Sequence, residues 1–147
     1  MLSIKMYSKE EAKNVRQQFW IMFGKRYDRK WLLYDTKLKN VILKFSFEDR
    51  RALVSIDITH DDSIFRAYYY EKLISLKNIM KEEVSEELIF EENYVVESGK
   101  TISRVFVTCE GVKIQKKHDW PKVYEFFYTY MDRLEFFFRE YQDFIDN

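Results

Sequence analysis

The feature that most constrains this chain is a run of large apolar side chains near its end, spaced three and four residues apart. A 3.6-residue period of this kind predicts an amphipathic helix, and Asp119 and Pro121 suit its N-cap and first turn. The apolar arc covers roughly 200°, more than one docking surface normally requires. The series consists of Trp120, Tyr124, Phe127, Met131, Leu134, Phe138, Tyr141 and Ile145.

Two further helices are predicted upstream. The first spans residues 8–23, because Ser8 and Glu11 form a capping box at its start and Gly24 suits its end. The second begins at Asp61 or Asp62, both good N-cap residues, and ends near residue 83. Each carries apolar side chains at helical spacing, so each is expected to pack against a sheet or another helix.

Alternation of apolar and polar residues predicts two β-hairpins between these helices. The paired segments are 41–48 with 52–59, and 88–96 with 101–109 around a tight Ser98-Gly99 loop. A short apolar strand is also expected at 31–34. The element order is therefore α-β-β-β-α-β-β-α. This order predicts an α+β fold, with an antiparallel sheet covered by helices and a long aromatic C-terminal helix.

Length and composition limit the classes of protein to consider. With 147 residues the chain is sized for one domain over 1–147, with Met1–Ile4 as a loose N-terminal extension and translation starting at Met1 or Met6. Its longest apolar run is five residues, 19–23, whereas a membrane helix needs roughly 20. The lone Cys109 has no partner for an internal disulfide and is typical of a reducing compartment. We therefore expect a cytoplasmic protein with no membrane partner.

The net charge is zero, but it is unevenly spread. Residues 1–51 carry 13 Lys/Arg against six Asp/Glu, whereas residues 52–112 carry six against 12. A balanced total argues against a dedicated nucleic-acid binder. A basic cluster beside an aromatic ring keeps single-strand binding open as an alternative to a solvated loop. That cluster is Lys25, Arg26, Arg29, Lys30 and Trp31.

One pair of carboxylates is a candidate catalytic site. Glu48 and Asp57 fall on the same polar face of the first hairpin, and His60 follows nearby. Clustered carboxylates hold Mg²⁺ in metal-dependent nucleases of the restriction-endonuclease type. The corresponding tripeptide, Asp57-Ile58-Thr59, lacks the lysine that would assist the attacking water. An active or relic nuclease site and an ordinary solvated sheet face both remain open, and we expect no bound metal or cofactor.

The wide apolar arc of the last helix suggests a contact surface. It is explained either by a helix sunk between a sheet and another helix, or by a homodimer or other protein partner. Tyr128 and Phe136 are the expected contacts on this helix. Tyr70 and Ile74 are expected to join them, because they lie opposite the apolar face of the second helix.

A set of short motifs is spread over nearly the whole chain from Met6 onward. They include Tyr7-Ser8-Lys9-Glu10-Glu11-Ala12, Phe23-Gly24-Lys25, Ile56-Asp57-Ile58-Thr59-His60, Gly99-Lys100 and Asp119-Trp120-Pro121. With these motifs the chain resembles a bacterial domain-of-unknown-function family, number 4268. The resemblance implies a single domain and no particular activity, since none of the motifs is catalytic. In some longer relatives the domain resembles a companion of nuclease-type modules, which favours the nucleic-acid hypotheses.

Three hypotheses for function follow from the sequence. The leading one is a non-enzymatic protein-interaction module, self-associating through its aromatic helix. The second is the metal-dependent nuclease or its relic, with Glu48, Asp57 and His60. The third is an accessory protein that binds nucleic acid through the basic cluster around Trp31.

Overall fold

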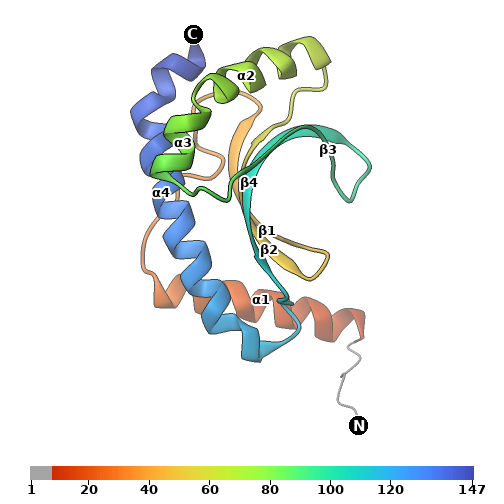
Figure 1. The fold of residues 1–147 in the computed structure, drawn as a ribbon. Coiled ribbons are helices and arrows are strands. Elements are labelled where there is room, and N and C mark those ends of the chain that lie inside the picture. Colours follow the sequence, from red (N-terminus) through yellow and green to blue (C-terminus); the bar gives the residue numbers. More distant parts are fainter. Residues whose placement is uncertain (1–7) are drawn as a thin grey trace.

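Two antiparallel hairpins build the sheet of the computed structural model, which describes residues 8–147 (Figure 1). The sheet order is β1-β2-β4-β3, so that β1 and β3 are the edge strands. Every neighbouring pair is antiparallel. The strands are β1 (Val41–Glu48), β2 (Arg51–Ile58), β3 (Ile89–Val95) and β4 (Thr101–Glu110).

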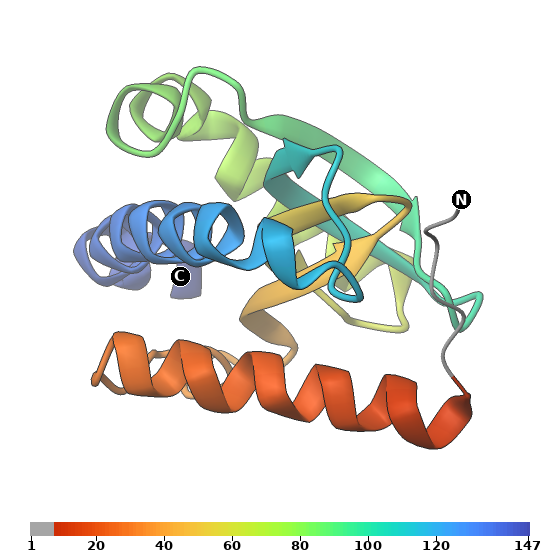
Figure 2. The same ribbon diagram turned by 90° about the horizontal axis from the view of Figure 1, so that it is seen from below.

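The helices cover one side of this sheet. In Figures 1 and 2, α4 runs along one face of the sheet, and α2 and α3 lie beside the C-terminal half of α4. Helix α1 crosses the end of the sheet where the β1–β2 hairpin turns. The bounds are α1 (Lys9–Arg26), α2 (Ser63–Ser75), α3 (Lys77–Glu83) and α4 (Trp120–Asp146), with a short 3₁₀ turn (Lys117–Asp119) before α4. The described part of the chain has no helix long and apolar enough to cross a membrane.

The main core lies between the sheet and the aromatic faces of α1 and α4. Phe19 on α1 is fully buried, and its ring lies 5.2 Å from Phe47 on β1 and 6.0 Å from Phe127 on α4. Eleven of the 27 residues of α4 are buried, because the sheet, α1 and the α2–α3 pair each contact a different part of its surface. The wide apolar arc of α4 is therefore largely used within the fold.

The opposite face of the sheet is strongly curved and carries a small core of its own. Leu53, Tyr94, Ile102 and Phe106 form this second cluster. Tyr94 lies on edge strand β3, yet its hydroxyl donates a hydrogen bond to Glu48 on edge strand β1 at 2.6 Å. The sheet thus curves until side chains from its two edge strands meet across the concave face.

The α+β fold class is confirmed, but the short strand predicted at 31–34 is wrong. Leu33 takes a left-handed φ of 45°, which lies outside the range of a strand, so this stretch is a loop. The Ser98-Gly99 turn also differs from the prediction. Val96 N–H bonds to the Lys100 carbonyl around a three-residue loop, and Gly99 takes the left-handed position at φ 92°.

Two helix boundaries also differ from the prediction. Helix α1 continues through Gly24 to Arg26, because Phe23 and Tyr27 pack against each other 5.5 Å apart and hold its last turn. The second predicted helix is two helices, since Leu76 between them leaves helical geometry at ψ 9°. The expectations for Met1–Ile4 and Met6 lie outside the described residues.

Candidate functional site

Glu48 and Asp57, the predicted metal ligands, both bind one arginine on the concave face of the sheet. Arg104 donates from Nε and Nη2 to the two carboxylate oxygens of Asp57, each at 2.8 Å. Its Nη1 donates to Glu48 at 2.7 Å. The side chains of Arg104 and Asp57 are only 1% and 2% exposed. The guanidinium therefore lies between the two carboxylates and neutralises part of their charge.

The charge state of this cluster follows from its hydrogen bonds. Burial alone would raise the pKa of Glu48, but the hydrogen bonds from Tyr94 and Arg104 outweigh burial and hold that pKa below its ordinary value. Burial would likewise lower the pKa of Arg104, but its bonds to Asp57 and Glu48 raise it. Burial and the bond to Glu48 raise the pKa of the Tyr94 hydroxyl, which stays a donor. The cluster is thus a hydrogen-bonded network that joins side chains from all four strands.

This geometry favours a structural role for the two carboxylates. A metal ion bound between them would have to displace a buried guanidinium that already makes three charge-assisted bonds. Within residues 8–147 no group of three or more His, Cys, Asp or Glu side chains is placed to hold a metal ion. Sequence reasoning missed Arg104, although an arginine in a strand beside Ile102, Val105 and Phe106 is a usable signal for a buried ion pair.

His60 is not part of this cluster. Its ring stacks on Tyr69 of α2 at 5.0 Å and 9°, and among the described residues no hydrogen bond or ion pair links it to Glu48 or Asp57. Burial, and then the nearby Arg66, lower the pKa of His60. The expected trio of Glu48, Asp57 and His60 is therefore not brought together.

The four predicted contact residues do not form one surface. Tyr70 is buried, at 7% exposure, and Ile74 is half-buried. The expectation that Tyr70 lies on an exposed face is wrong, because α2 is rotated so that Arg66 and Tyr70 face inward. Tyr128 stacks on Tyr27 at 4.6 Å and is half-buried. Phe136 is 66% exposed on α4, as predicted.

Exposed hydrophobic side chains gather instead where the start of α2 meets the end of α4. Ile64, Phe65, Tyr68 and Phe144 are 77%, 58%, 48% and 46% exposed. The Lys72 ammonium lies 4.7 Å from the Tyr68 ring and 5.8 Å from the Phe144 ring, so that both aromatics contact the same cation. We call these four residues the α2–α4 patch.

The basic cluster predicted for nucleic acid is divided by the fold. Arg29 pairs with Asp132 at 2.7 Å and with Glu135 at 3.0 Å, so its charge is neutralised from within. Its guanidinium also lies over the Trp31 ring at 3.9 Å, while Phe23 stacks parallel to that ring. Lys25, Arg26 and Lys30 are exposed on the surface. The aromatic ring expected to stack on bases is thus already covered by protein groups.

A groove runs along the outer edge of β1. The first half of this edge is covered by the preceding loop, since Leu43 N–H donates to the Leu33 carbonyl and the Thr36 hydroxyl donates to the Val41 carbonyl. In an antiparallel strand, alternate residues point their N–H and C=O groups to the same side. Phe45 and Phe47 therefore direct theirs outward, and no described residue bonds to them there.

Two hollows lie end to end along this edge and share Trp20 of α1. The first has a volume of about 310 Å³, and its lining includes Trp20, Phe23, Trp31, Lys44 and Phe45. The second has a volume of about 640 Å³. Since Lys44 and Phe45 point to opposite faces of the sheet, a hollow lined by both opens at the strand edge. We call them the aromatic pocket and the polar pocket, and together with the strand edge they form the β1 groove.

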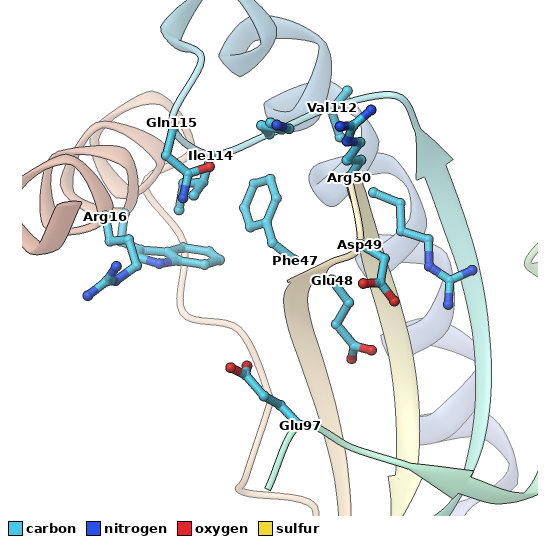
Figure 3. Close-up of a pocket in the computed structure, with 12 residues that line it drawn as sticks. Arg16, Phe47, Glu48, Asp49, Arg50, Glu97, Val112, Ile114 and Gln115 are labelled. Atoms are coloured by element: carbon cyan, nitrogen blue, oxygen red, sulfur yellow. The ribbon is translucent and has the colours of Figure 1, made fainter. Parts of the chain in front are cut away.

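The polar pocket carries a set of charged side chains. Figure 3 shows the Phe47 ring at its centre, with Arg16 and Gln115 on one side, Asp49 and Arg50 on the other, and Glu97 below. Arg51 and Lys113 complete its basic residues. Arg51 pairs with Glu110, whereas among residues 8–147 no ion pair holds Arg16, Arg50 or Lys113.

Beside the groove, some residues have an unfavourable backbone conformation, and part of the surface of α1 is open. Asp49 and Arg50 form the two-residue β1–β2 turn with φ of 47° and 61°, positions that favour Asn and Gly. Leu33, which lines the aromatic pocket, is also left-handed. Gly24 of α1 lines the same pocket, and a Cβ placed on it would meet nothing within 4 Å. Such local strain is often concentrated at binding sites.

Comparison with known proteins identifies a family for this chain. A family model described as "Domain of unknown function (DUF4268)" matches residues 15–142. No curated protein and no solved structure matches the chain. The matched range contains all four strands and the walls of the β1 groove.

Proposed function

The chain belongs to the DUF4268 family of domains of unknown function, and we propose that it is a non-catalytic protein-binding module in which an extended segment of a partner adds a strand to β1. The observation that carries this proposal is the uncovered half of the β1 edge, at Phe45 and Phe47, flanked by two hollows. Strand addition gives affinity through main-chain hydrogen bonds and specificity through alternate side-chain pockets.

The other edge of the sheet supports this assignment by contrast. Natural sheets protect their edges with charged side chains and bulges. Edge strand β3 carries Glu91 and Glu92 and has a register irregularity between Glu91 and Tyr94. Edge strand β1 has no irregularity and places Phe45 and Phe47 at its open part. An edge left open next to pockets is suited to a partner strand.

The competing hypotheses have less geometric support. The nuclease hypothesis requires Glu48 and Asp57 to leave a buried guanidinium. The nucleic-acid hypothesis requires a free aromatic face and a free basic cluster, but Arg29 and Trp31 are engaged with each other and with acidic side chains. Peptide binding uses groups that the fold leaves open.

Peptide selection combined with amide exchange tests the proposal. A phage-displayed library of random 12-residue peptides is selected on the purified protein, and enriched peptides are synthesised. We expect them to slow hydrogen exchange at the Phe45 and Phe47 amides, which exchange fast in the free protein. The Leu43 amide, already bonded to Leu33, serves as the internal control and is slow throughout. Enriched peptides that leave both amides fast would refute strand addition at this edge.

Self-association is a second candidate, favoured by the exposed α2–α4 patch. Light scattering over a hundredfold range of concentration tests it directly. If this patch joins two copies, Phe65→Glu is expected to convert a dimer into a monomer, whereas Phe136→Glu leaves the mass unchanged. A monomer at every concentration would remove this candidate and leave the β1 groove untouched.

A further inference from the structure

We propose that the segment bound in the β1 groove is acidic and carries an apolar anchor two residues from an Asp or Glu side chain. This inference rests on the proposed strand addition. It specifies the chemistry of the partner, which strand addition alone leaves open.

The spacing of the two pockets sets the spacing within the segment. The aromatic pocket lies at Phe45 and the polar pocket at Phe47, two residues further along β1. Two residues of a strand span about 7 Å, and their side chains point to the same face. An added strand therefore places residue i at one pocket and residue i+2 at the other. The segment reads apolar-x-acidic if it runs parallel to β1, and acidic-x-apolar if it runs antiparallel.

The aromatic pocket is suited to an apolar side chain. Its wall contains Trp20, which is 37% exposed and stacks on Phe127 at 5.7 Å, so that the indole is fixed from behind. Phe23, Trp31 and Phe45 complete the aromatic lining, and Gly24 leaves the α1 side open. Mostly apolar pockets of about this size anchor single side chains or small ligands. A Leu, Ile or Phe side chain would bury its surface there.

The polar pocket is suited to a carboxylate. Arg16, Arg50 and Lys113 have no ion-pair partner among the described residues, whereas the pocket acid Glu48 is already bonded to Arg104 and Tyr94. Two acids, Asp49 and Glu97, face these three cations. Most of the residues that line the groove lie within residues 8–51, which hold 12 Lys/Arg against six Asp/Glu. Charge complementarity therefore favours an acidic segment.

The unfavourable backbone conformation of Arg50 is a separate indication that its side chain takes part in binding. Arginine at a left-handed turn position costs about 1 kcal/mol relative to glycine. Lys37, at φ 64°, has the same conformation but lines neither pocket. Replacing Arg50 and Lys37 each by glycine therefore separates the backbone effect of a left-handed position from a binding role of the Arg50 side chain.

The experiment compares two fluorescein-labelled pools of ten-residue peptides by fluorescence polarisation. Both pools carry Leu, Ile or Phe at residue i, and residue i+2 is Asp or Glu in one pool and Lys or Arg in the other. Each pool contains both chain directions. We expect the acidic pool to bind at least tenfold more tightly and to weaken as salt is raised. Equal binding, or tighter binding of the basic pool, overturns the acidic assignment. Amide protection at Phe45 and Phe47 by the selected random peptides would still support strand addition.

Variants of the protein locate the binding. Arg16→Glu and Arg50→Gly are each expected to weaken the acidic pool about five- to tenfold, and Gly24→Phe is expected to abolish binding by filling the aromatic pocket. The matched controls are Lys25→Glu, Lys37→Gly and Gln18→Phe, which are exposed and line neither pocket. Controls that weaken binding as much as their partners would place the peptide elsewhere.

Two other outcomes also overturn the proposal. In the first, a 12-nucleotide single-stranded DNA competes with the acidic peptides for the protein. In the second, the protein self-associates and the Glu91→Lys variant does not, which would mean that β3 of a second copy fills the groove.

Discussion

At the scale of single residues, Arg104 holds together the concave face of the sheet. It satisfies Asp57 through two bonds and Glu48 through a third. Removing one partner of a buried ion pair typically costs about 3–5 kcal/mol, because the remaining charge stays buried without compensation. We therefore expect Arg104→Met to lower the free energy of unfolding by that amount in urea titrations. Adding Asp57→Asn should recover part of the loss, and the exposed Arg139→Met should change little. A small effect of Arg104→Met would mean that the pair contributes little net stability.

Glu48 gives the same cluster a pH dependence. Its pKa is depressed in the folded protein below the ordinary value of 4.5, so between the two values the unfolded chain binds the proton more readily. The stability that Glu48 contributes is therefore present above pH 4.5 and is lost as the pH falls through that value toward the folded pKa. Urea midpoints measured from pH 6 to pH 3 should fall less steeply in Glu48→Gln than in the wild type. Parallel curves for the two proteins would contradict this assignment.

At the scale of elements, α1 is less stable than it could be because of one residue. Glycine inside a helix costs roughly 0.5–1 kcal/mol relative to alanine. The space around Gly24 is open, so Gly24→Ala should raise the free energy of unfolding by about that amount. Gly99→Ala is the matched control, since its φ of 92° is strained for any residue with a Cβ, and it should lower stability. If both changes act in the same direction, helix propensity is not the cause.

The elements themselves were largely predictable, because their signals are local. The capping box at Ser8 and Glu11 and the three-four spacing of α4 gave the right helices. The β1 groove was not predictable from such signals. Which strand becomes an edge depends on the sheet order, and the loop at 31–34 bonds β1 through one backbone hydrogen bond, from the Leu43 N–H to the Leu33 carbonyl.

The charged cluster was predictable in part. Alternation correctly placed Glu48 and Asp57 on one face, because side-chain direction in a strand is a local property. Their partner Arg104 lies on β4, 47 residues after Asp57, and Tyr94 reaches Glu48 only because the sheet coils. The inward rotation of Tyr70 likewise follows from contacts that Arg66 makes with Asn93 and the His60 carbonyl. Such long-range geometry leaves no period in the sequence.

At the scale of the whole molecule, Cys109 is a reporter of unfolding. It is the chain's one cysteine, it lies in the main core, and burial raises the pKa of its thiol. Only the thiolate reacts with disulfide reagents, so the folded protein should label very slowly. We expect the labelling rate to rise with urea in proportion to the unfolded fraction measured by circular dichroism. Fast labelling without denaturant would mean that β4 opens locally while the rest stays folded.

The placement of the three tryptophans has an optical consequence. Trp20 and Trp31 line the β1 groove, whereas Trp120 is buried and donates its indole N–H to the Ile114 carbonyl at 2.7 Å. Indole emission shifts to the blue when water leaves the ring, and Trp120 provides a constant background because its surroundings are already dry. The unlabelled protein therefore carries an intrinsic fluorescent signal that changes when its groove is filled, and this signal can be read without knowing what fills it.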